Sequence, residues 1–313
     1  MKKCFGIDLG GTTVKLGLFE ETGAVLEKWE IPTRTEENGK YILEDIGNAL
    51  LGKMAELGLS KEEIVGAGIG IPGPVMPDGH VAFCVNLGWK NVNPGKVLSE
   101  MLGGIPVYGG NDANVAALGE QWQGGGKGHA SVAAVTLGTG LGCGIIMNGK
   151  IVSGNKGMAG ELGHVTVNRE ETEACNCGNK GCLELYSCAT GIVRLAKRHL
   201  AASEEASVLR NLETITAKDV VDAAKAGDSL ADGVLEESMD WLAQGLMFVS
   251  YVVDPEVFVV GGGVSRAGDF LLDKLRRHYD RFMVMAAEKP EIKLATLGND
   301  AGIYGAARLA LDL

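Results

Sequence analysis

Near the start of the chain, apolar residues recur in short runs that glycines interrupt. Residues 4–10 form an apolar run that ends in Gly-Gly, and apolar residues resume at 13–19. A third run at 24–31 follows the turn-forming pair Thr22-Gly23. Short apolar runs separated by turn residues predict consecutive strands, here three strands paired antiparallel.

Helical and strand patterns alternate beyond these runs. The spacing of apolar residues predicts a helix at 41–57, a buried strand at 64–71, a short strand at 105–108 and a second helix at 111–122. This alternation is typical of an α/β domain.

The second part of the chain begins again in the same way. A run at 131–137 ends in Gly-Thr-Gly, another covers 142–147, and the hairpin pair Asn148-Gly149 leads to a third at 151–153. Further helices are predicted at 216–226, 229–252, 268–284 and 299–311, and strands at 257–260 and 292–295. Thr216 and Asp219 are spaced as a capping box. We therefore expect an α/β unit written twice, as two lobes that face each other across a cleft.

Length and composition fit two folded domains. The chain has 313 residues, with 46% hydrophobic and 22% charged, and a typical domain has about 100–200 residues. We expect a smaller N-terminal α/β domain at 1–118, completed by the C-terminal helix at about 297–313, and a larger α/β domain at 119–296.

Charge and hydropathy exclude two classes of partner. The formal net charge is -11, which disfavours nucleic-acid binding because that depends on basic patches. The most apolar stretch, 242–260, is interrupted by Gln244, Asp254 and Pro255, and Asp8 comes too early for a signal peptide. We expect a soluble cytoplasmic protein with no membrane span.

Two glycine turns are candidates for phosphate binding. Asp8-Leu9-Gly10-Gly11-Thr12 follows the first run, and Leu137-Gly138-Thr139-Gly140 follows the run that opens the second half. Glycines leave backbone N–H groups open to an anion, and the threonines add hydroxyl donors. Asp8 is placed to hold a hydrated Mg²⁺. Either turn alone would fit a simple hairpin, whereas the pair favours phosphate.

Other nucleotide motifs fail. Gly124-Gly125-Gly126-Lys127 is followed by Gly128 and is therefore not a Walker A loop. Prolines flank the last glycine of Gly68-Ile69-Gly70-Ile71-Pro72-Gly73, and no helix opens there, which disfavours a Rossmann site.

Three of the seven cysteines lie together in one short segment. They are Cys175, Cys177 and Cys182, and His164 is the nearest histidine upstream. Thiolates and one imidazole are the ligands of a structural zinc ion. The alternative is three reduced, unpaired thiols on a loop, which would be exposed to oxidation.

A group of polar residues could serve a sugar. Asp112, with Asn111 before it, stands where a strand gives way to a helix, so it fits either a helix N-cap or a general base. Asn86, Glu161 and Glu184 could hydrogen-bond other hydroxyls, although each could equally be a surface residue.

Together these segments resemble the ROK family of sugar kinases and repressors, from about residue 4 to the end. Glu161-Leu162-Gly163-His164 matches its E-x-G-H motif, and Cys175 to Glu184 matches C-x-C-G-x-x-G-C-x-E. Gly261-Gly262-Gly263-Val264-Ser265 resembles its adenosine motif. The resemblance implies a duplicated ribonuclease H-like fold of the actin and hexokinase type.

The resemblance also implies roles for individual residues. Asp112 would be the catalytic base, and Gly73, Asn86, Asn111, Glu161, His164 and Glu184 would surround the sugar. His164 would double as a ligand of a structural Zn²⁺, with Cys175, Cys177 and Cys182. ATP and Mg²⁺ would bind at the glycine turns. The implied activity is phosphorylation of glucose to glucose 6-phosphate. Because members of the family commonly form dimers, the resemblance also implies a homodimer.

Alternatives remain open at this point. The substrate could be fructose, mannose, N-acetylglucosamine or N-acetylmannosamine, and polyphosphate could replace ATP. A non-catalytic sugar sensor is a different class, but ROK repressors carry a DNA-binding region ahead of the first turn, for which residues before Asp8 leave no room. A chaperone-like ATPase of the same superfamily would have no use for the cysteine segment.

Overall fold

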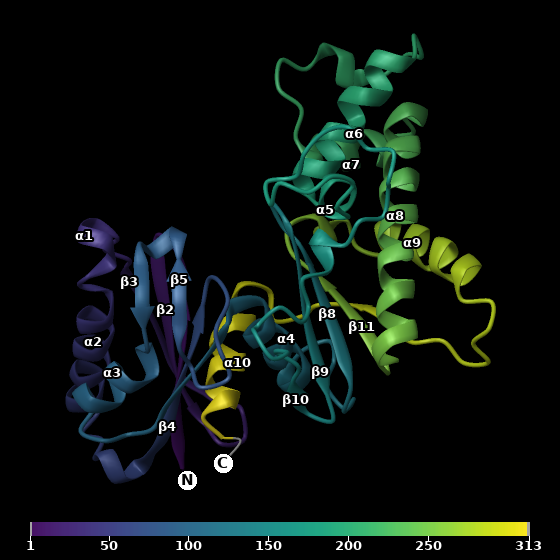
Figure 1. Ribbon diagram of the computed structural model, residues 1–313. Helices are drawn as coiled ribbons and strands as arrows, with labels where there is room; N and C mark the ends of the chain where they lie inside the picture. The colour runs from purple at the N-terminus through teal and green to yellow at the C-terminus, as the bar shows by residue number, and fades with distance from the viewer. Residues whose placement is uncertain (1, 312–313) are drawn as a thin grey trace. The chain divides into compact units, whose positions relative to one another are not determined.

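The computed structural model describes residues 2–311, and these divide into two compact units (Figure 1). Within the described residues, the first unit contains the chain up to Ala130, the segment Gly144–Gly160 and the chain from Leu297 onward. The second contains Ser131–Cys143 and Glu161–Thr296. One five-stranded sheet lies in the first unit, and most of the other lies in the second.

The first unit holds a five-stranded sheet of order β3-β2-β1-β4-β7 and a separate hairpin of β5 and β6. The strands are β1 (Lys3–Leu9), β2 (Thr13–Glu20), β3 (Val25–Pro32), β4 (Ile64–Ile71), β5 (Val81–Cys84), β6 (Trp89–Val92) and β7 (Val107–Asn111). The helices are α1 (Glu36–Gly39), α2 (Ile42–Glu56), α3 (Pro94–Met101), α4 (Asp112–Gln123) and α10 (Ala301–Leu309).

Alternation along β1 places different residues on the two faces of this sheet. Phe5, Ile7 and Leu9 belong to the large core that α2 and α3 cover. Cys4 belongs to a second core with residues of α10, which covers the opposite face (Figure 1). Gly6 lies on that opposite face, where a Cβ would stand 2.0 Å from the carbonyl oxygen of Ile303. The absence of a side chain therefore lets α10 pack directly on the strand.

The second sheet has the order β10-β9-β8-β11-β12. Its strands are β8 (Val132–Leu137), β9 (Leu141–Met147), β10 (Lys150–Ile151), β11 (Val257–Gly261) and β12 (Glu291–Leu294). The helices of this part of the chain are α5 (Glu184–Ser187), α6 (Ala189–Ala202), α7 (Ala217–Lys225), α8 (Ser229–Val253) and α9 (Asp269–Phe282).

Both sheets share one topology. In each sheet, the first three strands along the chain are antiparallel neighbours, and the last two run parallel to the first. Numbered by their order along the chain, the five strands lie side by side as third, second, first, fourth and fifth. This repeated order confirms the predicted duplication of an α/β unit. The duplicated fold of the actin and hexokinase type is thus the fold of this chain.

The first unit contains two segments, 119–130 and 144–160, that the predicted boundaries assigned to the second domain. The first belongs there because α4 is one continuous helix that packs along α10. In the other, Gly144 lies against α4, where a Cβ would stand 2.5 Å from that of Ala117. Strand β9 accordingly belongs partly to each unit.

Most of the predicted elements are confirmed, including the capping box at Thr216 and Asp219 and the left-handed Asn148-Gly149 turn. The predicted strand at 105–108 is displaced to Val107–Asn111. Five helices and strands of eight or fewer residues and one long helix had no counterpart in the sequence analysis: α1, β5, β6, α3, α5 and α6. No helix within residues 2–311 is long and apolar enough to span a bilayer.

Candidate functional site

The first glycine turn joins β1 to β2 and is held from one side. Gly10 N–H donates to the Thr13 carbonyl at 3.1 Å, and the Thr33 hydroxyl donates to the Gly10 carbonyl at 2.7 Å. Gly11 and Thr12 are exposed, and a Cβ at Gly11 would meet no atom within 4 Å. The outer side of the turn is therefore open to an anion.

Asp8 lies one residue before the end of β1, and its carboxylate contacts the start of α10. A Cβ at Gly302 would lie 2.5 Å from the Asp8 carboxyl carbon, so glycine makes room for this group. Burial raises the pKa of Asp8, and the charge of Lys15 partly offsets this effect. The carboxylate is thus held close behind the open turn.

Asn111 and Asp112 lie at the junction between β7 and α4. Asn111 is the N-cap, because its Oδ1 accepts from the Asn114 N–H at 3.1 Å. Its Nδ2 donates to the Gly73 carbonyl at 3.1 Å and to Asp112 Oδ1 at 3.0 Å. The N-cap alternative for Asp112 is therefore wrong, and its carboxylate is left for another role.

The surroundings of Asp112 favour a base. Burial raises the pKa of its carboxyl, and the nearby charge of Asp8 acts in the same direction. The N–H of Ala113, 2.8 Å from Asp112 Oδ1, opposes that rise. A carboxylate with a raised pKa accepts a proton more readily, which suits general-base catalysis.

Gly73 and Asn86 belong to loops that neighbour this junction. Gly73 has φ +133°, and the Cys84 thiol donates to the Pro72 carbonyl at 2.8 Å. Asn86 lies in the single helical turn Val85–Leu87 that follows Cys84. Asn111 and Gly73 are hydrogen-bonded, so the structure brings them and Asp112 together.

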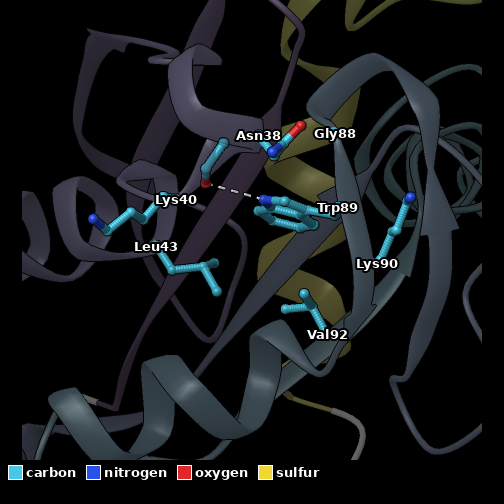
Figure 2. Close-up of a pocket in the computed structure, with 8 residues that line it drawn as sticks. Asn38, Lys40, Leu43, Gly88, Trp89, Lys90 and Val92 are labelled. Atoms are coloured by element: carbon cyan, nitrogen blue, oxygen red, sulfur yellow. Dashed lines mark hydrogen bonds between the residues drawn. The ribbon is translucent and has the colours of Figure 1, made fainter.

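The turn that carries Asn86 is anchored by Trp89. Figure 2 shows the Trp89 indole between the 38–43 segment and Val92. Its Nε1 donates to the Gly39 carbonyl at 3.1 Å, and Asn38 takes the left-handed φ of 59°. A Cβ at Gly88 would stand 2.7 Å from the Asn38 Cα. This tight contact lies beside a cavity of about 380 Å³. It holds Gly88 and Trp89, the residues that follow the turn of Asn86, against the 38–43 segment.

In the second unit, two glycine turns meet at one edge of the sheet. Strands β8 and β11 are parallel, with Gly261 opposite Thr136, so both end at the same side. Gly262 has φ +87°, and a Cβ there would stand 2.5 Å from the backbone of Leu137. The sequence-predicted groups Gly138-Thr139-Gly140 and Gly261-Gly262-Gly263 are thus neighbours.

Helix α6 supports the second glycine turn. Ala189 N–H donates to the Gly138 carbonyl at 2.9 Å, and the Thr190 hydroxyl donates to the Thr139 carbonyl at 2.9 Å. A cavity of about 760 Å³ lies beside the turn, lined by Thr139, by one face of α6 and by the start of α7. Sequence reasoning missed α6, although Ile192, Leu195 and Ala196 recur at helical spacing.

Glu171 anchors α6 through a buried ion-pair cluster that sequence reasoning also missed. Its side chain is 2% exposed and forms an ion pair with Arg194. Its carboxylate accepts two hydrogen bonds of 2.9 Å from the Arg198 guanidinium and one of 2.6 Å from the Tyr186 hydroxyl. These donors, the Arg198 contact foremost, hold the pKa of Glu171 far below its usual value.

Glu171→Gln is expected to destabilise the protein by about 2–4 kcal/mol at pH 7, because Arg194 and Arg198 lose their buried partner charge and keep only the exposed Glu173. A lowered folded-state pKa gives stability that is complete above the unfolded pKa of about 4.3 and is lost as pH falls below it. Urea unfolding from pH 7 to pH 3 should therefore show the two proteins converging in acid. Equal stability at pH 7 would contradict the role, and Glu170→Gln, at an exposed neighbour, is the control.

The cysteine segment forms a compact cluster with His164. The ligand atoms of His164, Cys175, Cys177 and Cys182 all lie within 4.8 Å of one another. Cys177 Sγ is 3.6 Å from Cys182 Sγ, and Cys175 Sγ is 3.8 Å from His164 Nδ1. Zn–S bonds of about 2.3 Å put the sulfurs of a tetrahedral site about 3.8 Å apart, so the four groups fit zinc.

Two carboxylates flank this cluster. Glu161 Oε2 lies 4.0 Å from His164 Nε2, the ring nitrogen opposite the one that faces Cys175. Glu184 Oε2 accepts from the Leu141 N–H at 2.9 Å, while its Oε1 is 3.7 Å from Cys175 Sγ. The structure therefore brings Glu161, His164 and Glu184 together around the cluster.

Comparison with known proteins decides the family. The model of the ROK family matches residues 4–313. The chain belongs to the ROK family. The predicted membership is confirmed, and within this family a glucokinase of Halalkalibacterium halodurans is 41% identical over 305 residues, which is 96% of this chain and 92% of that protein.

Solved ROK structures agree along the whole length. A ROK family glucokinase from Streptomyces griseus, in complex with glucose and AMPPNP, is 35% identical, covers 98% of each chain and has a TM-score of 0.76. A ROK hexokinase from Thermus thermophilus is 30% identical, covers 97% of this chain and 96% of its own, and has a TM-score of 0.82.

Proposed function

We propose that this protein transfers the γ-phosphate of ATP to glucose, forming glucose 6-phosphate and ADP. The observation that carries the proposal is the half-buried carboxylate of Asp112, oriented by Asn111 at the start of α4 and close enough to Asp8 for their charges to interact. Glucokinase relatives at up to 41% identity and a ROK structure with glucose and AMPPNP support the same activity.

In the proposed reaction, Asp112 accepts the proton of the sugar hydroxyl as its oxygen attacks the γ-phosphorus. A new P–O bond forms to the sugar, the bond between the γ-phosphorus and the bridging oxygen breaks, and ADP leaves with that oxygen. Asn111 keeps the Asp112 carboxylate in one orientation, which lowers the entropic part of the barrier.

The other polar residues take the sugar hydroxyls in this proposal. They are Gly73, Asn86, Asn111, Glu161, His164 and Glu184. The 3.1 Å bond from Asn111 to the Gly73 carbonyl and the Trp89 anchor hold the first set in place. Rigid polar groups of this kind are what a polyol site requires.

The glycine turns receive the nucleotide. Gly10, Gly11 and Thr12, and Gly138, Thr139 and Gly140, offer donors to phosphate oxygens. Gly261, Gly262 and Gly263 are proposed to lie against the nucleoside, and the cavity of about 760 Å³ beside Thr139 offers it room. Mg²⁺, when bound, would neutralise phosphate charge, and Asp8 is the residue proposed to hold its water shell.

We further propose a structural zinc ion held by His164, Cys175, Cys177 and Cys182. His164 Nδ1 faces Cys175, and this leaves Nε2 free to serve the sugar from the same ring. Zinc would shape this part of the sugar site without taking part in the transfer. Reduced thiols fit the cytoplasm, and we propose that location and a homodimeric assembly on the resemblance to the family.

An ADP-release assay with ATP·Mg²⁺ and a panel of hexoses and N-acetylhexosamines tests the activity. We expect the highest kcat/KM on glucose. Preference for fructose, mannose or an N-acetylhexosamine would keep the mechanism and replace the substrate. No turnover by folded protein on any sugar would reject the ATP-dependent kinase, and polyphosphate in place of ATP would then separate another phosphate donor from a non-catalytic sensor.

A further inference from the structure

The segment Cys182–Thr190 links two sites that the proposal treats separately. It begins at Cys182, a residue of the Cys/His cluster, and ends at Thr190, whose hydroxyl donates to the Thr139 carbonyl. Cys182, Leu183, Tyr186, Ser187 and Cys188 are buried, so most of the segment is fixed by packing. We call Cys182–Thr190 the linking segment.

Glu184 makes the first connection from the linking segment to the second glycine turn. Its Oε2 accepts from the Leu141 N–H at 2.9 Å, directly after Gly140. A Cβ at Gly140 would stand 2.4 Å from the same oxygen, so the turn packs on the carboxylate. The other oxygen is 3.7 Å from Cys175 Sγ. One side chain thus contacts both the metal cluster and the turn.

Cys188 and Thr190 make the second connection. The Cys188 thiol donates to the Glu184 carbonyl at 3.1 Å and lies 3.1 Å from the Thr190 hydroxyl. Thr190 then donates to the Thr139 carbonyl, and Ala189 N–H donates to the Gly138 carbonyl, both at 2.9 Å. The turn is therefore held on its carbonyl side by the start of α6 and at its far end by Glu184.

We propose that the linking segment couples the Cys/His cluster to nucleotide binding, with Glu184 and Thr190 as positioning residues of the second glycine turn. Metal loss then weakens the binding of nucleotide phosphates, in addition to any effect on sugar. A turn that binds anions through its backbone depends on the placement of its N–H groups. Greater mobility of the linking segment would therefore lower the affinity of the turn for nucleotide phosphates. The inference rests on the proposed zinc site and on the proposed phosphate role of Gly138-Thr139-Gly140.

Thr190→Val tests the positioning role independently of the metal. Without sugar present, calorimetric titration should give a Kd for AMPPNP·Mg²⁺ raised by about 3- to 10-fold, the effect of one lost hydrogen bond. The Kd for AMP, which lacks the β- and γ-phosphates, should stay within about twofold. Thr172→Val, at an exposed threonine, is the matched control. An unchanged AMPPNP Kd in Thr190→Val would overturn the role of Thr190.

Metal removal tests the coupling itself. Metal content is measured first, by mass spectrometry, and folding of the stripped protein is checked by circular dichroism. We expect the AMPPNP Kd of stripped protein to rise by about 10-fold or more and zinc to restore it. Folded, stripped protein that binds AMPPNP as tightly as loaded protein would overturn the coupling.

Two Glu184 variants keep the inference testable if stripped protein unfolds. In Glu184→Gln an amide oxygen can still accept from the Leu141 N–H, whereas Glu184→Ala removes the acceptor. The AMPPNP Kd of loaded protein should therefore rise more in Glu184→Ala, and equal values in the two would reject the positioning role. Failure of wild-type protein to bind AMPPNP at all would instead reject the proposed kinase function.

Discussion

Asp112→Asn is expected to lower kcat by about 10²- to 10⁴-fold, the range that a positioned general base contributes. Asparagine cannot take the proton of the sugar hydroxyl at neutral pH. It has nearly the same size, and its amide oxygen can still accept from the Ala113 N–H, which lies 2.8 Å from Asp112 Oδ1. The loss should therefore be confined to the chemical step.

Two measurements separate this role from a structural one. The Kd for glucose, by calorimetry, should stay within a few-fold of the wild-type value, and the unfolding midpoint should not fall. Asp78→Asn is the matched control, because the exposed Asp78 carboxylate accepts a hydrogen bond from the backbone of His80. Loss of glucose binding with wild-type kcat in Asp112→Asn would be incompatible with a catalytic base.

Cys177→Ala is expected to empty the cluster of metal and to weaken glucose binding by about 10-fold or more. The remaining proposed ligands, His164, Cys175 and Cys182, would leave a tetrahedral site one thiolate short. His164, a proposed ligand of both the metal and the sugar, would then lose its bond to the metal. Metal per chain by mass spectrometry and the glucose Kd by calorimetry measure the two effects.

A cysteine outside the cluster provides the control for this change. Cys4 is buried in the core beside α10, and Cys4→Ala should lower stability through lost packing while leaving the metal content unchanged. Wild-type metal content in Cys177→Ala would contradict the proposed ligand set. Metal loss with an unchanged glucose Kd would show instead that the cluster does not shape the sugar site.

Some of the candidate site could be read locally. The cysteine spacing brings three thiols together within one short loop, and the structure adds His164 to them as expected. The two glycine turns also follow from neighbouring residues, since each ends an apolar strand. Local patterns of this kind depend on a few adjacent residues, so the sequence alone carries them.

Other features could not be read in this way. Asp112 fitted both an N-cap and a base, and only the side-chain direction of Asn111 decided between them. Glu171 gives no local signal, because its partners Tyr186, Arg194 and Arg198 come from later segments. The amphipathic pattern of α6 is present in the sequence. Its charged residues Arg194 and Arg198 pair with Glu171, a contact that the sequence does not indicate.

By itself, the sequence determined most of the strands and helices, the glycine turns, the residues of the Cys/His cluster and the resemblance to the family. Hydrophobic periodicity and turn chemistry act over a few residues, so the sequence alone carries them. Only the tertiary structure decided which residue caps α4, which segment supports the second glycine turn and how Glu184 joins that turn to the cluster. Those contacts join residues distant in the chain, and their geometry arises only when the core is packed.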